Sequence, residues 1–317
     1  MWSYFLRRLL LAIPTVLGAV TLVFCVMRVI PGDPVALFIP PDTPGSATAA
    51  VEARIRHEYG FDRPLYQQYA QYLRQMATGD FGRSIRQNTL VSADLRFRVP
   101  NTLELGVPAF ALSIVFGIAL GTLSAVRRGT WMDNAAMFGA LFGVSVPDFW
   151  LALMLILLFA LRFPLLPPSG WGGPIYTAAG IQHLVLPAVV LGLGGAGALA
   201  RYTRSSMLEV INHDYVRTAR AKGLREAAVI TRHVLRTSLP TIITLLGLGF
   251  GRVLGGTVIV ETVFGWPGVG RYLVSGINGR DYPVVQAAVL LVAVSFVVAN
   301  LVTDLILVYV DPRIRYS

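Results

Sequence analysis

The sequence predicts an all-α membrane protein with six transmembrane helices and an extracytoplasmic insertion after the first. Three observations carry this prediction. The 317 residues are 55% hydrophobic and only 14% charged, whereas about 25% of the residues of a soluble domain are charged. Six apolar segments are long enough to span a bilayer, which takes about 20 helical residues. The net charge of +10 gathers in loops on one side of these segments, as the positive-inside rule describes.

The first apolar segment, residues 9–30, follows Arg7 and Arg8. It is too long for the apolar region of a signal peptide and lacks a cleavage site of small residues. We therefore expect residues 1–30 to form the first transmembrane helix, with a cytoplasmic N-terminus. Cys25, the single cysteine, lies within this run, and we expect it to be a buried structural thiol.

Residues 31–99 form a long polar insertion. Amphipathic patterns at residues 49–59 and 65–77 predict two helices, which Gly60 and Pro64 separate. The insertion is too small and too polar for a catalytic domain with a large core. We expect an extracytoplasmic cap that a delivery protein approaches.

Residues 100–311 hold the other five predicted spans, and residues 312–317 form a short tail. The five spans lie at about residues 102–126, 134–161, 182–202, 240–263 and 284–310. Arginines at positions 127 and 128 and between positions 201 and 236 fall on the side of the N-terminus, as do those of the tail. The short loops on the other side contain only Arg162, Arg271 and Arg280. Both termini are therefore predicted to be cytoplasmic.

Two features of these spans predict how they pack. Pro147 should kink the third span. Small residues allow helices to approach closely in lipid, and the fourth and fifth spans are rich in glycine. These glycines are Gly192, Gly194, Gly195, Gly197, Gly247, Gly251 and Gly255.

Ionisable residues inside spans are costly and usually face a cavity or a partner, and four of them are candidates for such a role. They are Asp148, Arg252, Glu261 and Asp304. One interpretation is structural, with Arg252 pairing with Asp148 or Asp304. The other is that some of the four line a path for cargo, in which case Arg252 would favour carboxylate-bearing cargo.

A polar island at residues 212–225 separates the fourth and fifth spans. Asp214 is positioned to cap a short basic helix, and Gly223 to end it in the left-handed conformation. Ala219 and Ala221 are expected on its surface, where small residues let a partner approach. An ordinary positively charged cytoplasmic loop is the other interpretation.

The chain carries no motif for chemistry of its own. A P-loop needs Gly-Lys followed by Ser or Thr, but the single lysine, Lys222, precedes Gly223. The four histidines are scattered, without the spacing of a metal site. We therefore expect no catalytic residue, no metal and no cofactor in this chain, and basic–aromatic clusters typical of nucleic-acid binding are absent.

The run from Asp214 to Leu224, followed by Arg232-His233 and Leu239-Pro240, resembles the "EAA" loop of bacterial ABC importer permeases, in the dipeptide/oligopeptide branch. The motif's opening Glu-Ala-Ala reads Arg217-Thr218-Ala219 here, a departure that the peptide branch shares. Residues 59–66, 79–84, 261–271 and 280–286 also resemble that branch. The resemblance implies a type I permease fold with a coupling loop at residues 203–240. It also implies that the residues that couple to an ATPase are Asp214, Tyr215, Arg217, Ala219, Arg220, Ala221, Lys222, Gly223 and Leu224.

The same resemblance implies partners and cargo. The partners would be a second homologous permease, two ATP-binding cassette subunits that hold ATP and magnesium, and an extracytoplasmic solute-binding protein, all at a bacterial inner membrane. Dipeptides, oligopeptides, glutathione, nickel chelates and some saccharides remain open as cargo. The alternatives are a secondary transporter driven by an ion gradient, although no internal duplication is evident, and a membrane scaffold or receptor without transport.

Overall fold

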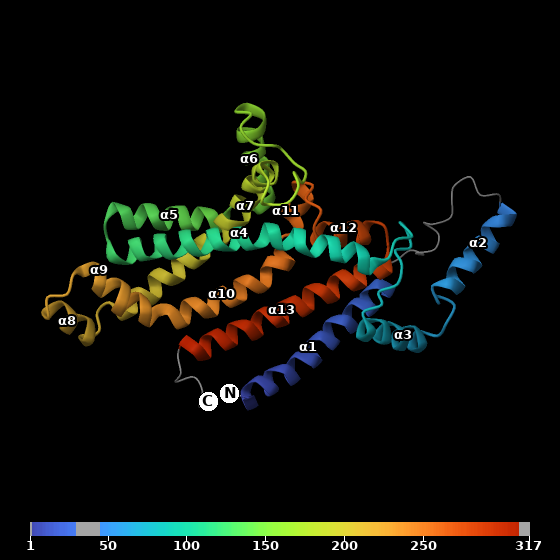
Figure 1. Cartoon of the computed structure of the whole chain (residues 1–317), viewed down its shortest axis with the longest axis horizontal. Coiled ribbons are helices and arrows are strands. Elements are labelled where there is room, and N and C mark those ends of the chain that lie inside the picture. The colour runs from blue at the N-terminus through green and yellow to red at the C-terminus, as the bar shows by residue number, and fades with distance from the viewer. Residues whose placement is uncertain (1, 30–44, 311–317) are drawn as a thin grey trace.

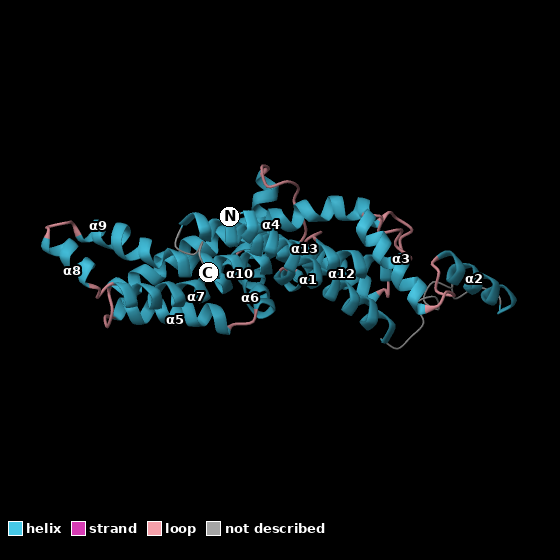
Figure 2. Ribbon diagram, turned by 90° about the horizontal axis from the view of Figure 1, so that it is seen from below, coloured by secondary structure: helices cyan, strands magenta, loops and turns pink. Residues whose placement is uncertain are grey.

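Regular structure in the described part of the chain is helical, apart from one bridge pair between Arg83 and Leu90. The computed structural model describes residues 2–29 and 45–310. Its long helices run roughly side by side in an elongated bundle (Figures 1 and 2). The all-α prediction is confirmed for these residues.

Thirteen α-helices and two π-helical segments follow one another along the described residues. In order they are α1 (Trp2–Val29), α2 (Gly45–Glu58), α3 (Leu65–Thr78), α4 (Val91–Val126), α5 (Trp131–Ser145), α6 (Asp148–Ile156), η2 (Leu157–Arg162), α7 (Ala178–Val210), α8 (Asp214–Ala221), α9 (Glu226–Ala228), η3 (Val229–Leu235), α10 (Arg236–Gly256), α11 (Val258–Val263), α12 (Val269–Asn278) and α13 (Tyr282–Val310).

Four helices, α1, α4, α7 and α13, are long and apolar enough to cross a membrane, and α5 with α6 makes a fifth span if the two count as one. α10, within the predicted fifth span, packs beside α13 (Figure 1). The side chains of residues 251–256, at its end, lie outside the described part. The count of six spans therefore stays a prediction.

The predicted third span is broken, where we expected a kink. α5 ends at Ser145, and the helix that restarts at Asp148 is bent by 102° from it. Pro147 stands before α6 in an extended conformation, at φ −62° and ψ 136°, and a proline has no N–H to continue a helix. α6 therefore leaves the direction of the bundle (Figure 1). The predicted fifth span divides in a similar way, because α10 ends at Gly256 and α11 follows separately.

Small residues bring α4, α5 and α7 into close contact, as predicted for the fourth span. A Cβ at Gly121 of α4 would lie 2.6 Å from the Ala200 carbonyl oxygen of α7. The Ser113 hydroxyl of α4 donates to the Gly192 carbonyl of α7 at 2.9 Å. Gly197 faces the Ala140 carbonyl of α5 closely enough to exclude a side chain. These approaches allow polar backbone groups to contribute to helix association in lipid.

The insertion contains both predicted helices, as α2 and α3. α3 packs on α1, where the Tyr69 and Thr21 hydroxyls lie 2.7 Å apart. α4 begins at Val91, so the long second span starts inside the range assigned to the insertion. Cys25 is exposed on α1, so the expectation of a buried thiol is wrong. The buried side of this helix is formed instead by Val20, Phe24 and Met27.

Candidate functional site

The polar island between α7 and α10 forms the predicted short helix, α8. Its N-cap is His213, at φ −68° and ψ 151°, and no side chain caps the helix. The prediction that Asp214 is the cap is therefore wrong by one residue, because a turn closed by the His213 N–H on Val210 O places His213 before the helix. Asp214 lies in the first turn, where a carboxylate is favourable to the helix dipole, and its Oδ1 is 3.7 Å from Arg217 Nη1.

Gly223 ends α8 in the left-handed conformation, at φ +76°, as predicted. The Gly223 N–H donates to Arg220 O at 2.9 Å, and the Leu224 N–H donates to Ala219 O at 3.4 Å. These two bonds are the pair that defines a Schellman motif. Nothing lies within 4 Å of a Cβ placed at Gly223. The glycine is therefore required by its backbone conformation and not by a close neighbour.

α8 has one buried face and one exposed face. Val216 and Ala219 are three residues apart, so they lie on the same side of the helix, and both are buried against Met207 and Val210 of α7. The expectation that Ala219 lies on the surface is therefore wrong. The exposed face carries the other predicted coupling residues, which are Asp214, Tyr215, Arg217, Arg220, Ala221, Lys222, Gly223 and Leu224.

An ion pair closes the loop between α8 and α9. Arg220 Nε donates to Glu226 Oε2 at 3.1 Å, and Arg220 Nη2 donates to Glu226 Oε1 at 2.8 Å. These hydrogen bonds lower the pKa of Glu226 below its usual value. Arg220 is thus held within the loop, while Lys222, the residue that follows α8, is exposed.

A buried carboxylate ties the helices beneath α8 together. Asp133, at the start of α5, is almost fully buried. It accepts two hydrogen bonds from Arg204 of α7, each at 2.9 Å, one from the Gly129 N–H at 3.0 Å, and one from the Ser124 hydroxyl of α4. One side chain therefore joins α4, α5 and α7 at the end of the bundle that carries α8.

A cavity of about 590 Å³ lies among α4, α5, α6, α7 and α10. Its walls are mostly apolar or glycine, including Phe110, Gly194 and Leu245. Asp148, the first residue of α6, is the only formally charged side chain among the described residues that line it. The break in the third span therefore places a carboxylate at the edge of an interior space.

Two of the other three predicted path residues, Glu261 and Asp304, lie elsewhere. Glu261 is fully buried and does not line this cavity. It accepts hydrogen bonds from the hydroxyls of Thr102 and Thr257 at 2.8 and 3.0 Å and from the Arg271 N–H at 2.9 Å. Asp304 is half-buried on α13, outside the cavity lining. The Arg252 side chain lies outside the described residues, so its predicted pairing stays a prediction.

The sequence offered no local signal for two of these clusters. Asp133 and Arg204 are 71 positions apart, and Thr102 and Glu261 are 159 apart. In the sequence Asp133 falls between the second and third predicted spans, where a polar residue is expected in any case. Only the packing of α4 against α5 and α7 shows that this carboxylate is buried.

Comparison with known proteins identifies the family. A model of the binding-protein-dependent transport system inner membrane component matches residues 117–316, and a model of the N-terminal part of such membrane components matches residues 1–106. The dipeptide transport system permease protein DppB of Alkalihalophilus pseudofirmus is 40% identical over 337 aligned positions, covering all of both chains. The glutathione transport system permease protein GsiC of Salmonella choleraesuis is 41% identical over 317, again covering all of both.

Among solved structures, the inward-facing MetNI methionine ABC transporter is similar in fold. One chain matches with a TM-score of 0.55 at 18% identity, and the alignment covers 68% of this chain and 96% of that one. The chain belongs to the family of binding-protein-dependent transport system inner membrane components, and it is a permease subunit of an ABC importer.

Proposed function

We propose that this permease carries small peptides, and that α8 is the helix through which ATPase subunits drive it. The observation that carries the coupling proposal is the position of α8. Its buried face rests on α7, its exposed face is basic, and it lies at one end of the bundle (Figure 1). An exposed amphipathic helix at such a place suits insertion into a groove of a partner.

The contacts beneath α8 connect this helix to the helices that line the 590 Å³ cavity. Val216 and Ala219 pack with Met207 of α7 and Ala125 of α4, and the Arg204–Asp133 ion pair fixes α7 to α5 nearby. α4, α5 and α7 also line the cavity. A displacement of α8 therefore shifts the walls of the cavity, because packed helices move as units between discrete arrangements.

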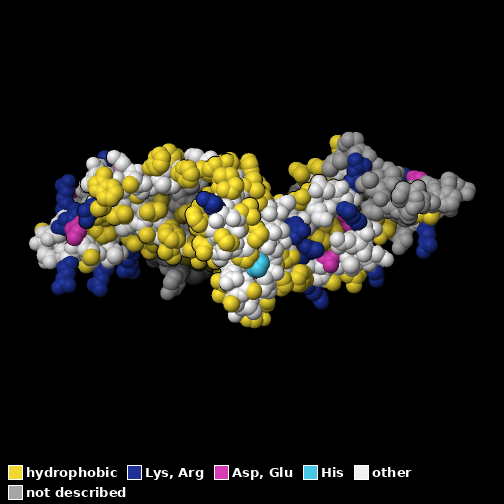
Figure 3. All heavy atoms as spheres, turned by 90° about the horizontal axis from the view of Figure 1, so that it is seen from above, with side chains coloured by type: hydrophobic (Ala, Val, Ile, Leu, Met, Phe, Trp, Pro, Cys, Tyr) yellow, Lys and Arg dark blue, Asp and Glu magenta, His cyan; other side chains and the backbone are white. Residues whose placement is uncertain are grey.

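The partners of this chain follow from the family. A permease without a nucleotide site needs ATP-binding cassette subunits, which hold ATP and magnesium. A second homologous permease would complete the path, and a binding protein would deliver cargo from outside. We place the α8 end and both termini in the cytoplasm. Figure 3 shows Lys and Arg side chains at the α8 end beside a largely hydrophobic surface, and others toward the opposite end. The placement rests on those of the short loops, because the positive-inside rule constrains a long translocated insertion only weakly.

The cargo proposal rests on the relatives and on Asp148. Relatives with 40% identity or more are named as dipeptide and glutathione permeases. Both kinds of cargo carry an amino group and a carboxylate. The Asp148 carboxylate at the cavity edge is suited to the ammonium group, which is attracted more strongly in a poorly hydrated site than in water.

Two left-handed glycines make a matched test of the coupling role. Gly223 and Gly129 have φ of +76° and +77°, and neither has an atom within 4 Å of a built Cβ. Valine at either position should therefore cost a similar amount, roughly 1–2 kcal/mol of backbone strain. Gly129 lies in the α4–α5 turn, outside α8, so only Gly223→Val disturbs the end of the docking helix.

For the test, each variant is purified with its partner subunits in mild detergent and the complex is then reconstituted into lipid vesicles. We expect Gly223→Val to reduce ATP-driven dipeptide uptake at least tenfold, while Gly129→Val retains most of it at equal expression. Equal loss in both variants, or normal uptake in Gly223→Val, would contradict the coupling role. Uptake that survives ATP depletion but is abolished by a protonophore would support the ion-driven alternative instead.

A further inference from the structure

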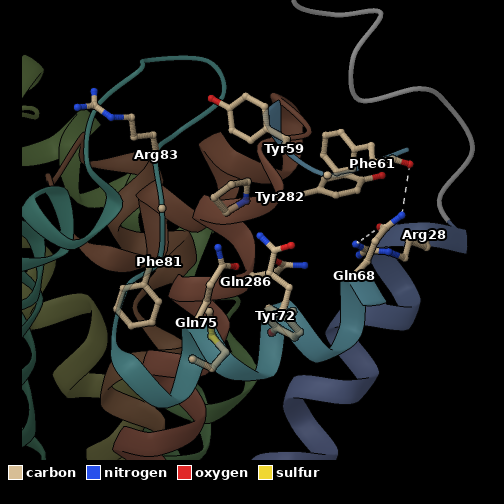
Figure 4. Close-up of a pocket in the computed structure, with 15 residues that line it drawn as sticks. Arg28, Tyr59, Phe61, Gln68, Tyr72, Gln75, Phe81, Arg83, Tyr282 and Gln286 are labelled. Carbon is tan, nitrogen blue, oxygen red and sulfur yellow. Dashed lines mark hydrogen bonds between the residues drawn. The ribbon is translucent and has the colours of Figure 1, made fainter. Parts of the chain in front are cut away.

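A second cavity, of about 250 Å³, lies near α3, at the end of the molecule away from α8. Its walls come from the end of α1, from α3, from the start of α13 and from residues 59–61 and 81–83 (Figure 4). It shares no lining residue with the 590 Å³ cavity. We call it the outer cavity, because the proposed orientation places it outside the membrane.

The Tyr72 hydroxyl is the most informative group in the outer cavity. The side chain is 3% exposed, and its ring stacks on Phe24 with centroids 5.7 Å apart. The hydroxyl oxygen is buried and has no hydrogen-bond partner among the described residues. Burial raises the pKa of Tyr72 to about 12, so the hydroxyl keeps its proton at neutral pH and is available as a donor.

An unsatisfied buried hydroxyl costs about 1–3 kcal/mol, and nearly all buried polar groups in native proteins have a partner. A phenylalanine at this position would supply the same ring without that cost. The hydroxyl of Tyr72 is therefore a donor that an acceptor bound in the cavity can use.

The charges around the cavity define that acceptor. Arg28 stacks on Phe24 at 3.6 Å from the ring centroid and donates from Nη2 to Gln68 Oε1 at 2.8 Å, and its buried Nε has no partner among the described residues. Arg83 also lines the cavity, whereas no Asp or Glu does among the described residues. The Gln286 amide, on a side chain only 8% exposed, adds another polar group.

These donors match a carboxylate. A guanidinium offers a planar fork of N–H groups, which fits the two oxygens of a carboxylate, and a phenol O–H adds a third bond to the same group. The glutamine amides of the cavity can pair with peptide groups, and Phe61 and Tyr282 supply apolar surface (Figure 4). A cationic ligand would meet Arg28, and no acidic residue among the described lining would balance it.

We propose that the outer cavity is a binding site for a carboxylate-bearing peptide group, separate from the 590 Å³ cavity. Two sources present this chemistry on the outer side, namely a free small peptide and an acidic residue of the docked binding protein. The proposal rests on the proposed function for its orientation and for these two sources, and on Tyr72, Arg28 and Gln286 for its chemistry.

The experiment uses the complete transporter in lipid nanodiscs and compares Tyr72→Phe with Tyr69→Phe. Tyr69 is on the same helix, and its hydroxyl lies 2.7 Å from that of Thr21, but it does not line the cavity. Calorimetry measures the affinity for alanyl-alanine and for its C-terminal amide. A parallel binding measurement uses the purified binding protein.

If a free peptide is the source, Tyr72→Phe should weaken alanyl-alanine binding about tenfold or more, since a hydrogen bond to a charged group is worth about 1.5–3 kcal/mol. Tyr69→Phe should leave the affinity unchanged, and the amide should bind more weakly than the acid. If the binding protein is the source, Tyr72→Phe should weaken its docking by a similar factor and leave dipeptide binding unaffected. Gln286→Leu should act in the same direction as Tyr72→Phe in either case.

The proposal is overturned if Tyr72→Phe alters neither affinity. It is also overturned if Tyr69→Phe has the same effect as Tyr72→Phe. Without ligand, Tyr72→Phe should melt no lower than the wild type, because it removes an unsatisfied group, and this measurement confirms that the variant is folded. Uptake, and its loss in Gly223→Val, are measured on the same preparations. If uptake is ATP-driven and is lost in Gly223→Val, but Tyr72→Phe changes neither affinity, the outer-cavity proposal is refuted and the proposed function is not.

Discussion

The buried Glu261 carboxylate should be a major determinant of stability, through the junction of α4, α11 and α12. Its two oxygens accept from the hydroxyls of Thr102 and Thr257 and from the Arg271 N–H, at 2.8, 3.0 and 2.9 Å. The chain after α11 folds tightly around the carboxyl group, because a Cβ at Gly268 would clash with it. Alanine at position 261 removes all three bonds and leaves the hydroxyls of Thr102 and Thr257 buried and the Arg271 N–H partly buried.

Each buried donor left without a partner costs about 1–3 kcal/mol, so Glu261→Ala should lose roughly 3–9 kcal/mol. A typical protein has about 5–15 kcal/mol in total. At about 2–4 °C per kcal/mol, the melting temperature should fall by at least about 6 °C. Glu261→Gln keeps the size and one acceptor oxygen, so its loss should be intermediate.

The assay is thermal unfolding of the purified subunit complex in detergent, followed by tryptophan fluorescence. Glu104→Gln is the matched control, because Glu104 lies on α4 near Thr102 and its Oε2 is buried without a partner among the described residues. That substitution should not lower the melting temperature. The reasoning is refuted if Glu261→Ala melts within about 2 °C of the wild type, or if Glu104→Gln is equally destabilising.

Three further outcomes follow from the charged clusters. Arg204→Ala leaves Asp133 buried and unpaired, so it should cost about 3–5 kcal/mol, seen as a lower melting temperature and yield. If the 590 Å³ cavity is the transport path, Asp148→Asn removes its charge, so it should raise the KM for dipeptide uptake several-fold while leaving the basal ATPase rate unchanged. Arg220 holds the folded pKa of Glu226 below its usual 4.5, so the pair stabilises the loop at neutral pH and loses this effect as the pH falls through the lowered folded pKa. Amide hydrogen exchange of α8 should therefore accelerate on acidification in the wild type and less so in Arg220→Gln.

The sequence was sufficient for features that depend on local pattern. The apolar runs, the amphipathic pattern of α3 and the glycine at position 223 each reflect forces within a few residues, and the structure has them where expected. The peptide-permease resemblance, which rests on short motifs, is confirmed by the family comparison.

Features that depend on tertiary contacts could not be predicted from the sequence. Pro147 indicates a disturbed helix, but whether α5 kinks or breaks by 102° depends on the packing available to α6. Ala219 seemed suitable for a surface because it is small, yet its three-residue spacing from Val216 turns it toward α7. The burial of Asp133 depends on Arg204, which a single sequence gives no reason to pair with it.

The lysine at the end of α8 has a practical consequence. Lys222 is the only lysine in the sequence, and it is exposed beside Gly223. Amine-reactive dyes or cross-linkers can therefore modify one side chain in the whole subunit, without any engineered cysteine. The rate at which Lys222 is modified should be slow when a partner covers α8 and fast when the helix is free. This rate therefore reports on whether a partner is bound, and it can be followed through the transport cycle.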